Sequence, residues 1–86
     1  MFANLKNLKI LDLSWNKLSR INPQSFFGIE NLKELSIGKN NLSNFDLAIL
    51  ENIPQIEIID LRGNPIENKK EILHFFKDSK IKLHFI

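Results

Sequence analysis

A repeated spacing of apolar residues and asparagine constrains this chain more than any other feature. The first copy runs from Leu8 to Leu18 and reads L-x-x-L-x-L-x-x-N-x-L. The same frame returns from Leu32 and again from Ile56, so the copies begin 24 residues apart. A fixed period of this length predicts a stack of equivalent units, because each unit buries its apolar edge only against a neighbour.

The frame resembles that of the leucine-rich repeat family, whose repeats are about 20–29 residues long. The resemblance implies an α/β solenoid: a right-handed coil with parallel strands on its concave face, irregular or short helical segments on its convex face, and a C-terminal cap of helix plus strand. It also implies a structural ladder of stacked asparagines, which satisfy backbone groups that the bend would otherwise leave unpaired. The ladder residues are Asn16, Asn40 and Asn64.

We expect one domain, residues 1–86, made of consecutive repeats. Residues 1–7 match the tail of a preceding repeat, because Phe2 lies 24 positions before Phe26. The expected repeats span residues 8–31, 32–55 and 56–66, and the expected C-terminal cap spans residues 67–86. A chain that begins inside a repeat is expected to be a fragment of a longer array. Its uncapped N-terminal end would leave Phe2, Leu5 and Leu8 partly exposed, which predicts self-association through that end.

The segments between the predicted strands carry turn and cap signals. Pro23 argues against a long helix in the first repeat, and the stretch Ile21–Ile29 is similar to the 24-residue "typical" subclass of the family. That subclass is common in extracellular eukaryotic receptors. In the second repeat, Asp46 is positioned to cap a short helical turn. The triplet Asn41-Leu42-Ser43 is an N-glycosylation sequon, whose use would require secretion.

The third copy departs from the frame after residue 66. Asn68 and Glu71 have the spacing of a capping box, which predicts the start of an amphipathic helix of about 10 residues. The apolar residues expected on one face of this helix are Ile72, Phe75 and Phe76. Lys82–Phe85 is predicted to be a fourth strand in register with the others. Helix plus strand is similar to the cysteine-free caps of some intracellular leucine-rich repeat proteins.

Composition narrows the class of protein further. Hydrophobic residues make up 43% of the chain, yet no apolar run reaches the length of about 18 residues that a membrane span requires. The absence of cysteine excludes disulfide-bonded caps and thiolate metal sites. Residues 62–86 carry six Lys or Arg against three Asp or Glu, a surplus too sparse to predict nucleic-acid binding.

The compartment clues conflict. The repeat type slightly favours an extracellular or secreted protein. The absence of cysteine, together with the lack of a visible signal peptide at Met1–Asn4, keeps a cytoplasmic location open.

The outward-pointing strand residues form the candidate binding surface. Side chains alternate between the two faces of a strand, and residues 24 apart lie side by side on neighbouring parallel strands. The predicted rows are Ile10, Glu34, Ile58 and Lys82; Asp12, Ser36, Asp60 and His84; and Ser14, Gly38, Arg62 and Ile86, with Trp15, Lys39 and Gly63 beside them. Trp15 is the only tryptophan and stands outside the core frame. It is either a contact residue or a structural one that packs on Leu18 or covers the edge of the stack.

An enzyme or metal site is not expected on this surface. A hydrolytic triad needs histidine between serine and aspartate, whereas the row places Asp60 between Ser36 and His84. Asp60 and His84 alone would give a metal two protein ligands where three or four are usual. We therefore expect no catalytic residues, no metal and no cofactor.

The resemblance implies non-catalytic protein–protein recognition, of the kind found in receptor-like or innate-immune leucine-rich repeat proteins. The partner would be a protein of unknown identity that contacts the concave face. The alternative is a structural role, in which the chain caps a longer array and the binding surface lies upstream.

Overall fold

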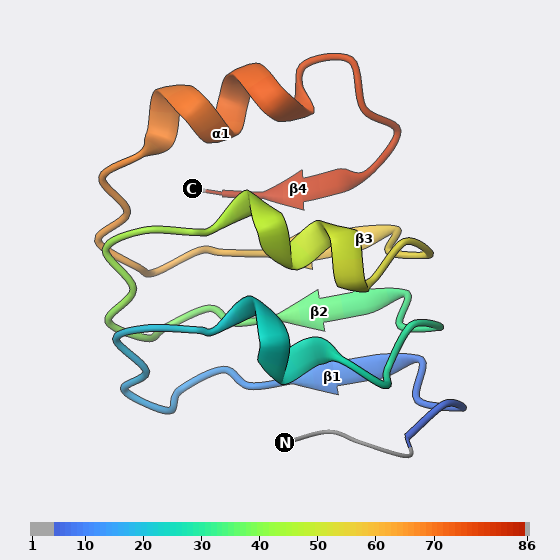
Figure 1. The fold of residues 1–86 in the computed structure, drawn as a ribbon. Coiled ribbons are helices and arrows are strands. Elements are labelled where there is room, and N and C mark those ends of the chain that lie inside the picture. The colour runs from blue at the N-terminus through green and yellow to red at the C-terminus, as the bar shows by residue number, and fades with distance from the viewer. Residues whose placement is uncertain (1–4, 86) are drawn as a thin grey trace.

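A parallel sheet of short strands forms one wall of the molecule in the computed structural model, which describes residues 5–85 (Figure 1). The strands follow one another in chain order as β1-β2-β3-β4. Their bounds are Ile10–Asp12 for β1, Glu34–Ser36 for β2, Ile58–Asp60 for β3 and Lys82–His84 for β4. This sheet, with short helical pieces opposite it, confirms the predicted α/β solenoid and includes the predicted fourth strand.

The register of the sheet follows the sequence period. Ile10 pairs with Glu34, Glu34 with Ile58, and Ile58 with Lys82. Backbone bonding continues past the ends of the strands, because the Trp15 N–H donates to the carbonyl of Gly38 at 3.1 Å. The rows predicted for residues 10–12 and their equivalents are therefore confirmed, and Ile86 of the third row lies outside the described residues.

The convex side is built from short 3₁₀ helices, η1 (Pro23–Phe26) and η2 (Leu47–Asn52). Each begins at a side chain that accepts a bond from the backbone N–H two residues on: Asn22 caps η1 and Asp46 caps η2, both at 2.9 Å. The prediction for Asp46 is confirmed. Pro23 occupies the first position of η1, where its missing N–H removes no helical bond.

The core lies between the sheet and the convex segments. Inward-facing strand residues such as Leu35 and Ile59 meet Phe26 and Ile49 from the other side, and none of the four is more than 1% exposed. Since each repeat supplies both halves of this layer, burial is complete only where a repeat has neighbours on both sides.

The β1 end of the stack is an open apolar face. Its frame residues are only half-buried, namely Leu8, Leu11, Leu13, Leu18 and Ile21. Their equivalents 24 positions later are at most 1% exposed, namely Leu32, Leu35, Ile37, Leu42 and Phe45. Leu5 is 44% exposed, as predicted for this end, and Phe2 lies outside the described residues.

This open face leads us to expect concentration-dependent self-association, because covering apolar surface is favourable. Sedimentation velocity should show the chain shifting from monomer to dimer as its concentration rises. Leu8→Lys should weaken the association, whereas Phe27→Lys, a change of the same kind in the segment after η1, should not. A clean monomer at millimolar concentration would disprove the expectation.

The other end of the stack is covered by helix α1 (Lys69–Phe76), which lies beyond β4 in Figure 1. Ile72 and Phe76, four residues apart, face the stack and are 0% and 8% exposed. The prediction was wrong for Phe75, which is 49% exposed. Only a narrow stripe of this short helix contacts the stack, and the Phe75 ring packs edge-on against Phe76 with centroids 5.1 Å apart.

The predicted capping box at the start of α1 was also wrong. The Asn68 side chain makes no cap bond to the helix. Instead its oxygen accepts from the Phe45 backbone N–H at 3.1 Å, and its amide donates to the Phe45 carbonyl at 3.0 Å. Two bonds to a buried backbone outweigh one cap bond at an exposed helix end, so Asn68 fastens the last segment to the repeat before it.

Within residues 5–85, no helix has the length and apolarity to cross a membrane.

Candidate functional site

The predicted contact residues all lie at the surface. Trp15 is 76% exposed and Ile10 is 62% exposed, large apolar side chains that the core does not use. Asp12, Lys39, Arg62 and Lys82 are also exposed, and the remaining six are half-buried: Ser14, Glu34, Ser36, Ile58, Asp60 and His84. The sheet therefore brings these residues together on one face.

A depression of about 400 Å³ lies where the chain leaves the strands. Trp15 and Lys39 line one part of it, and Asp60 and Arg62 line another. Ser14 and the small residues Gly38 and Gly63 complete the lining. An aromatic ring and charges of both signs thus surround one hollow.

A second depression, of about 240 Å³, runs across the strands themselves. It is lined by residues of all four strands, including Ile10, Glu34, Ile58 and His84. Asp60 and Arg62 border both hollows, so the two form one continuous concave surface.

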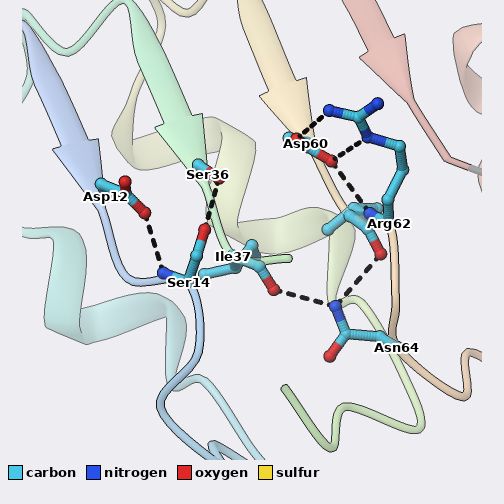
Figure 2. Close-up of polar contacts among 8 residues, drawn as sticks. Asp12, Ser14, Ser36, Ile37, Asp60, Arg62 and Asn64 are labelled. Atoms are coloured by element: carbon cyan, nitrogen blue, oxygen red, sulfur yellow. Dashed lines mark hydrogen bonds and ion pairs between the residues drawn. The ribbon is translucent and has the colours of Figure 1, made fainter. Parts of the chain in front are cut away.

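Asp60 and Arg62 form a forked ion pair. The guanidinium donates to the carboxylate at 3.0 Å through Nε and at 2.8 Å through Nη2, and the Arg62 backbone N–H donates to it as well (Figure 2). These bonds to the Arg62 side chain hold the pKa of Asp60 below its ordinary value, and they raise the pKa of Arg62. Both groups are therefore charged at neutral pH, and each has its own countercharge.

A second set of polar contacts joins Asp12, Ser14 and Ser36. The Asp12 carboxylate accepts from the Ser14 backbone N–H at 2.9 Å, and the two serine hydroxyls lie 2.7 Å apart (Figure 2). The Ser14 N–H lowers the pKa of Asp12. Asp12 and Asp60 therefore each accept a hydrogen bond from the backbone N–H two residues later, a local role that was not predicted.

One backbone position is left-handed in every repeat. Trp15, Lys39 and Gly63, which are 24 residues apart, have φ of 65°, 56° and 79°. Glycine adopts this conformation freely, whereas another residue pays about 1–2 kcal/mol for it. The strain at Trp15 was not predicted, although Gly63 in the equivalent place was the signal for it.

The Lys39 side chain lies close to both of the equivalent residues, Trp15 and Gly63. Its ammonium lies 5.6 Å from the centre of the Trp15 ring, within the range of a cation–π contact. Its Cδ lies 2.6 Å from where a Cβ on Gly63 would stand. Glycine at position 63 thus avoids the strain of this φ and leaves the space that the Lys39 side chain occupies.

The asparagine ladder holds the turn behind this surface. The Asn40 amide donates to the carbonyls of Leu13, Ile37 and Gly38 at 3.0–3.1 Å. Its oxygen accepts from the backbone N–H groups of Asn16 and Leu18 at 3.0 and 2.9 Å. Asn64 repeats the pattern one turn on: its amide donates to the carbonyls of Ile37 (Figure 2) and Leu61. Its oxygen accepts from the Leu42 N–H.

Residues 6–66 match the family model described as leucine rich repeat. The chain belongs to the leucine-rich repeat family. Strand, ladder asparagine and convex segment thus recur at the spacing that the family frame implied.

Several leucine-rich repeat proteins are similar in sequence. The chain is 42% identical over 67 residues to Toll-like receptor 8 of Homo sapiens and 39% identical over 67 residues to Toll-like receptor 9 of Mus musculus. Each match covers 77% of this chain and 6% of the receptor. The chain is also 40% identical over 58 residues to keratocan of Gallus gallus, which covers 65% of this chain and 16% of that protein. It therefore spans a small part of the length of these relatives.

The contacts on the leucine-rich repeat face do not join Ser36, Asp60 and His84 into a catalytic array. Ser36 bonds to Ser14, and Asp60 bonds to Arg62. Asp60 pairs in register with Ser36 on one side and His84 on the other, the order that the sequence predicted. Among residues 5–85, no group of three His, Asp or Glu side chains is placed to hold a metal ion.

The sequon of the second leucine-rich repeat is accessible at both of its functional positions. Asn41 and Ser43 are exposed, while Leu42 between them is 1% exposed and belongs to the core. Glycosylation at Asn41 stays a prediction that depends on secretion.

Proposed function

We propose that this chain is a non-catalytic protein-recognition module and that its contact surface is the concave sheet face. The observation that carries the proposal is the exposure of Trp15 and Ile10 on that face, at 76% and 62%. Exposed aromatic and apolar side chains beside a charged pair are typical of the centre and rim of a protein interface. The proposed contact residues are the twelve surface residues described above.

The relatives support a receptor-like or innate-immune setting, since two of those described are named Toll-like receptors. Such a setting favours an extracellular location, in agreement with the repeat type. We further propose the repeat boundaries 8–31, 32–55 and 56–66 with a cap over residues 67–86. The family match ends at residue 66, which supports that division.

The second candidate function is structural: the chain closes one end of a longer array. The burial of Ile72 and Phe76 on the inner face of α1 favours it, because these residues cover the end of the stack beyond β4. In that case the concave face of this segment would contribute little to binding.

The two functions are separated by replacing one exposed apolar residue on each side of the sheet. Ile10→Glu should abolish capture of specific partner proteins, measured by quantitative affinity capture from the source cells and their medium. Phe27 is 56% exposed in the segment after η1, so Phe27→Glu is the matched control and should leave the captured set unchanged. Both variants should melt at the wild-type temperature, since surface changes of this kind alter stability by about 0.5 kcal/mol or less.

If Ile10→Glu captures the same proteins as the wild type, recognition through this face is wrong. If no specific protein is captured by the wild type and the isolated segment instead stabilises a longer array, the structural role is correct.

A further inference from the structure

We propose that the depression around Trp15, Lys39 and Arg62 binds an acidic segment of a partner protein. A carboxylate of that segment would lie at the two cations, and an adjacent apolar side chain would cover the indole ring. This inference rests on the proposed function and names the chemistry of its partner.

The fold does not require a tryptophan at position 15. Its φ of 65° is the conformation that Gly63 supplies without strain in the third repeat. Its ring is 76% exposed, so burial in the core does not offset that strain. A strained residue that persists without a packing role points to a function at that position, and a tryptophan ring gains most when a partner covers it.

The charges at the depression favour an acidic ligand. Both oxygens of Asp60 already accept from Arg62, so this carboxylate is neutralised by its own neighbour. Lys39 has no carboxylate partner among residues 5–85. Its ammonium lies over the Trp15 ring and still has N–H donors available for a ligand. The Arg62 side chain is 53% exposed. The lining therefore carries one uncompensated positive charge directly beside an apolar ring.

A peptide fits this hollow better than a nucleic acid strand does. A strand is held by a groove of several cations that follows its backbone and by several aromatic rings that stack on successive bases. Trp15 is the only aromatic residue that lines the depression, and a single positive charge is left uncompensated. A short segment of protein can place one apolar side chain on the Trp15 ring and one carboxylate at Lys39.

The inference is tested by the emission of Trp15, which reports this site alone because the chain has no other tryptophan and no tyrosine. The probes are two acetylated synthetic peptides that differ only in charge, with one leucine flanked by glutamates in the first and by lysines in the second. The glutamate peptide should produce a saturable blue shift of the emission, and the lysine peptide should produce none. Equal responses to both, or no saturable response at millimolar glutamate peptide, would overturn the inference.

Lys39 and Lys17 provide a matched pair of variants. Both are exposed lysines with φ of 56°, but only Lys39 lines the depression. Asparagine tolerates this φ, so each substitution to asparagine removes the same charge from the same backbone conformation. Lys39→Asn should weaken binding of the glutamate peptide about tenfold, and Lys17→Asn should leave it unchanged. An equal loss in both variants would mean that net charge alone attracts the peptide, and the site would be wrong.

Trp15→Asn separates recognition from packing. Since asparagine accepts the left-handed backbone, the melting temperature should stay the same or rise, while binding measured by calorimetry falls about thirtyfold or more. A clear drop in melting temperature would show that the ring supports the fold, and the inference would fail. Tighter binding of a single-stranded oligonucleotide than of the glutamate peptide, with a steep salt dependence, would overturn it as well.

The two proposals fail in different ways. If Ile10→Glu abolishes partner capture while Lys39→Asn and Trp15→Asn do not, the concave face recognises a protein but the depression around Trp15 does not bind it. If none of the three variants changes partner capture, both proposals are wrong.

Discussion

Replacing Asn40 by alanine should lower the free energy of unfolding by about 3 kcal/mol or more. Asn40 is 6% exposed and its side chain bonds to five backbone groups in two repeats. Alanine would leave the N–H groups of Asn16 and Leu18 without partners and would remove one bond from each of the three carbonyls. Each buried unsatisfied group costs about 1–3 kcal/mol. Urea unfolding followed by circular dichroism measures the loss.

The neighbouring and equivalent asparagines provide the controls. Asn41 is adjacent and exposed, so Asn41→Ala should change the unfolding free energy by about 0.5 kcal/mol or less. Asn16 lies at the exposed end of the ladder, and its side-chain amide donates only to the carbonyls of Leu13 and Ser14. The loss from Asn16→Ala should therefore fall between those of the other two variants. A loss at Asn40 no greater than that at Asn41 would mean that the ladder does not hold the repeats together.

Phe26→Ala should be the other most damaging single change, with an expected loss of about 3–5 kcal/mol in the free energy of unfolding. Phe26 ends η1 and is 0% exposed within the core between the sheet and the convex segments. Removing its ring leaves a cavity that the flanking repeats cannot close without losing their register.

Phe27 is the natural comparison, because it is the next residue, has the same side chain and is 56% exposed. Phe27→Ala should shift the unfolding midpoint only slightly, since little surface is uncovered. Equal losses from the two variants would show that helix propensity in η1, and not burial, decides the stability of this segment.

The register of the sheet and the ladder followed from the sequence because both depend on a period that three copies repeat. Once Leu35 and Ile59 are assigned to the inward face, their neighbours must point outward. Asp46 was also predictable, since a cap depends on a residue and the backbone immediately after it. These features are local or periodic, and each copy constrains the next.

Two features that the sequence did not reveal depend on contacts between different segments of the stack. Asn68 has the spacing of a cap residue, but the Phe45 backbone of the preceding repeat offers it two bonds instead. Phe75 belongs to an apolar stripe, yet the surface beneath α1 is wide enough only for Ile72 and Phe76. A third feature lies within one repeat: the fork that compensates Asp60 with Arg62 is a side-chain geometry that spacing alone does not specify.

The left-handed position shared by Trp15, Lys39 and Gly63 has a consequence for how such a surface changes over time. Each repeat offers one site where the chain turns back, and the side chain there stands clear of the core. A tryptophan, a lysine and a glycine occupy it in succession without altering the pairing of the strands beside it. Each side chain at this position can therefore be identified by its repeat and its place in the repeat. Substitution of one such side chain can alter specificity, while the core layers that keep the molecule folded remain the same.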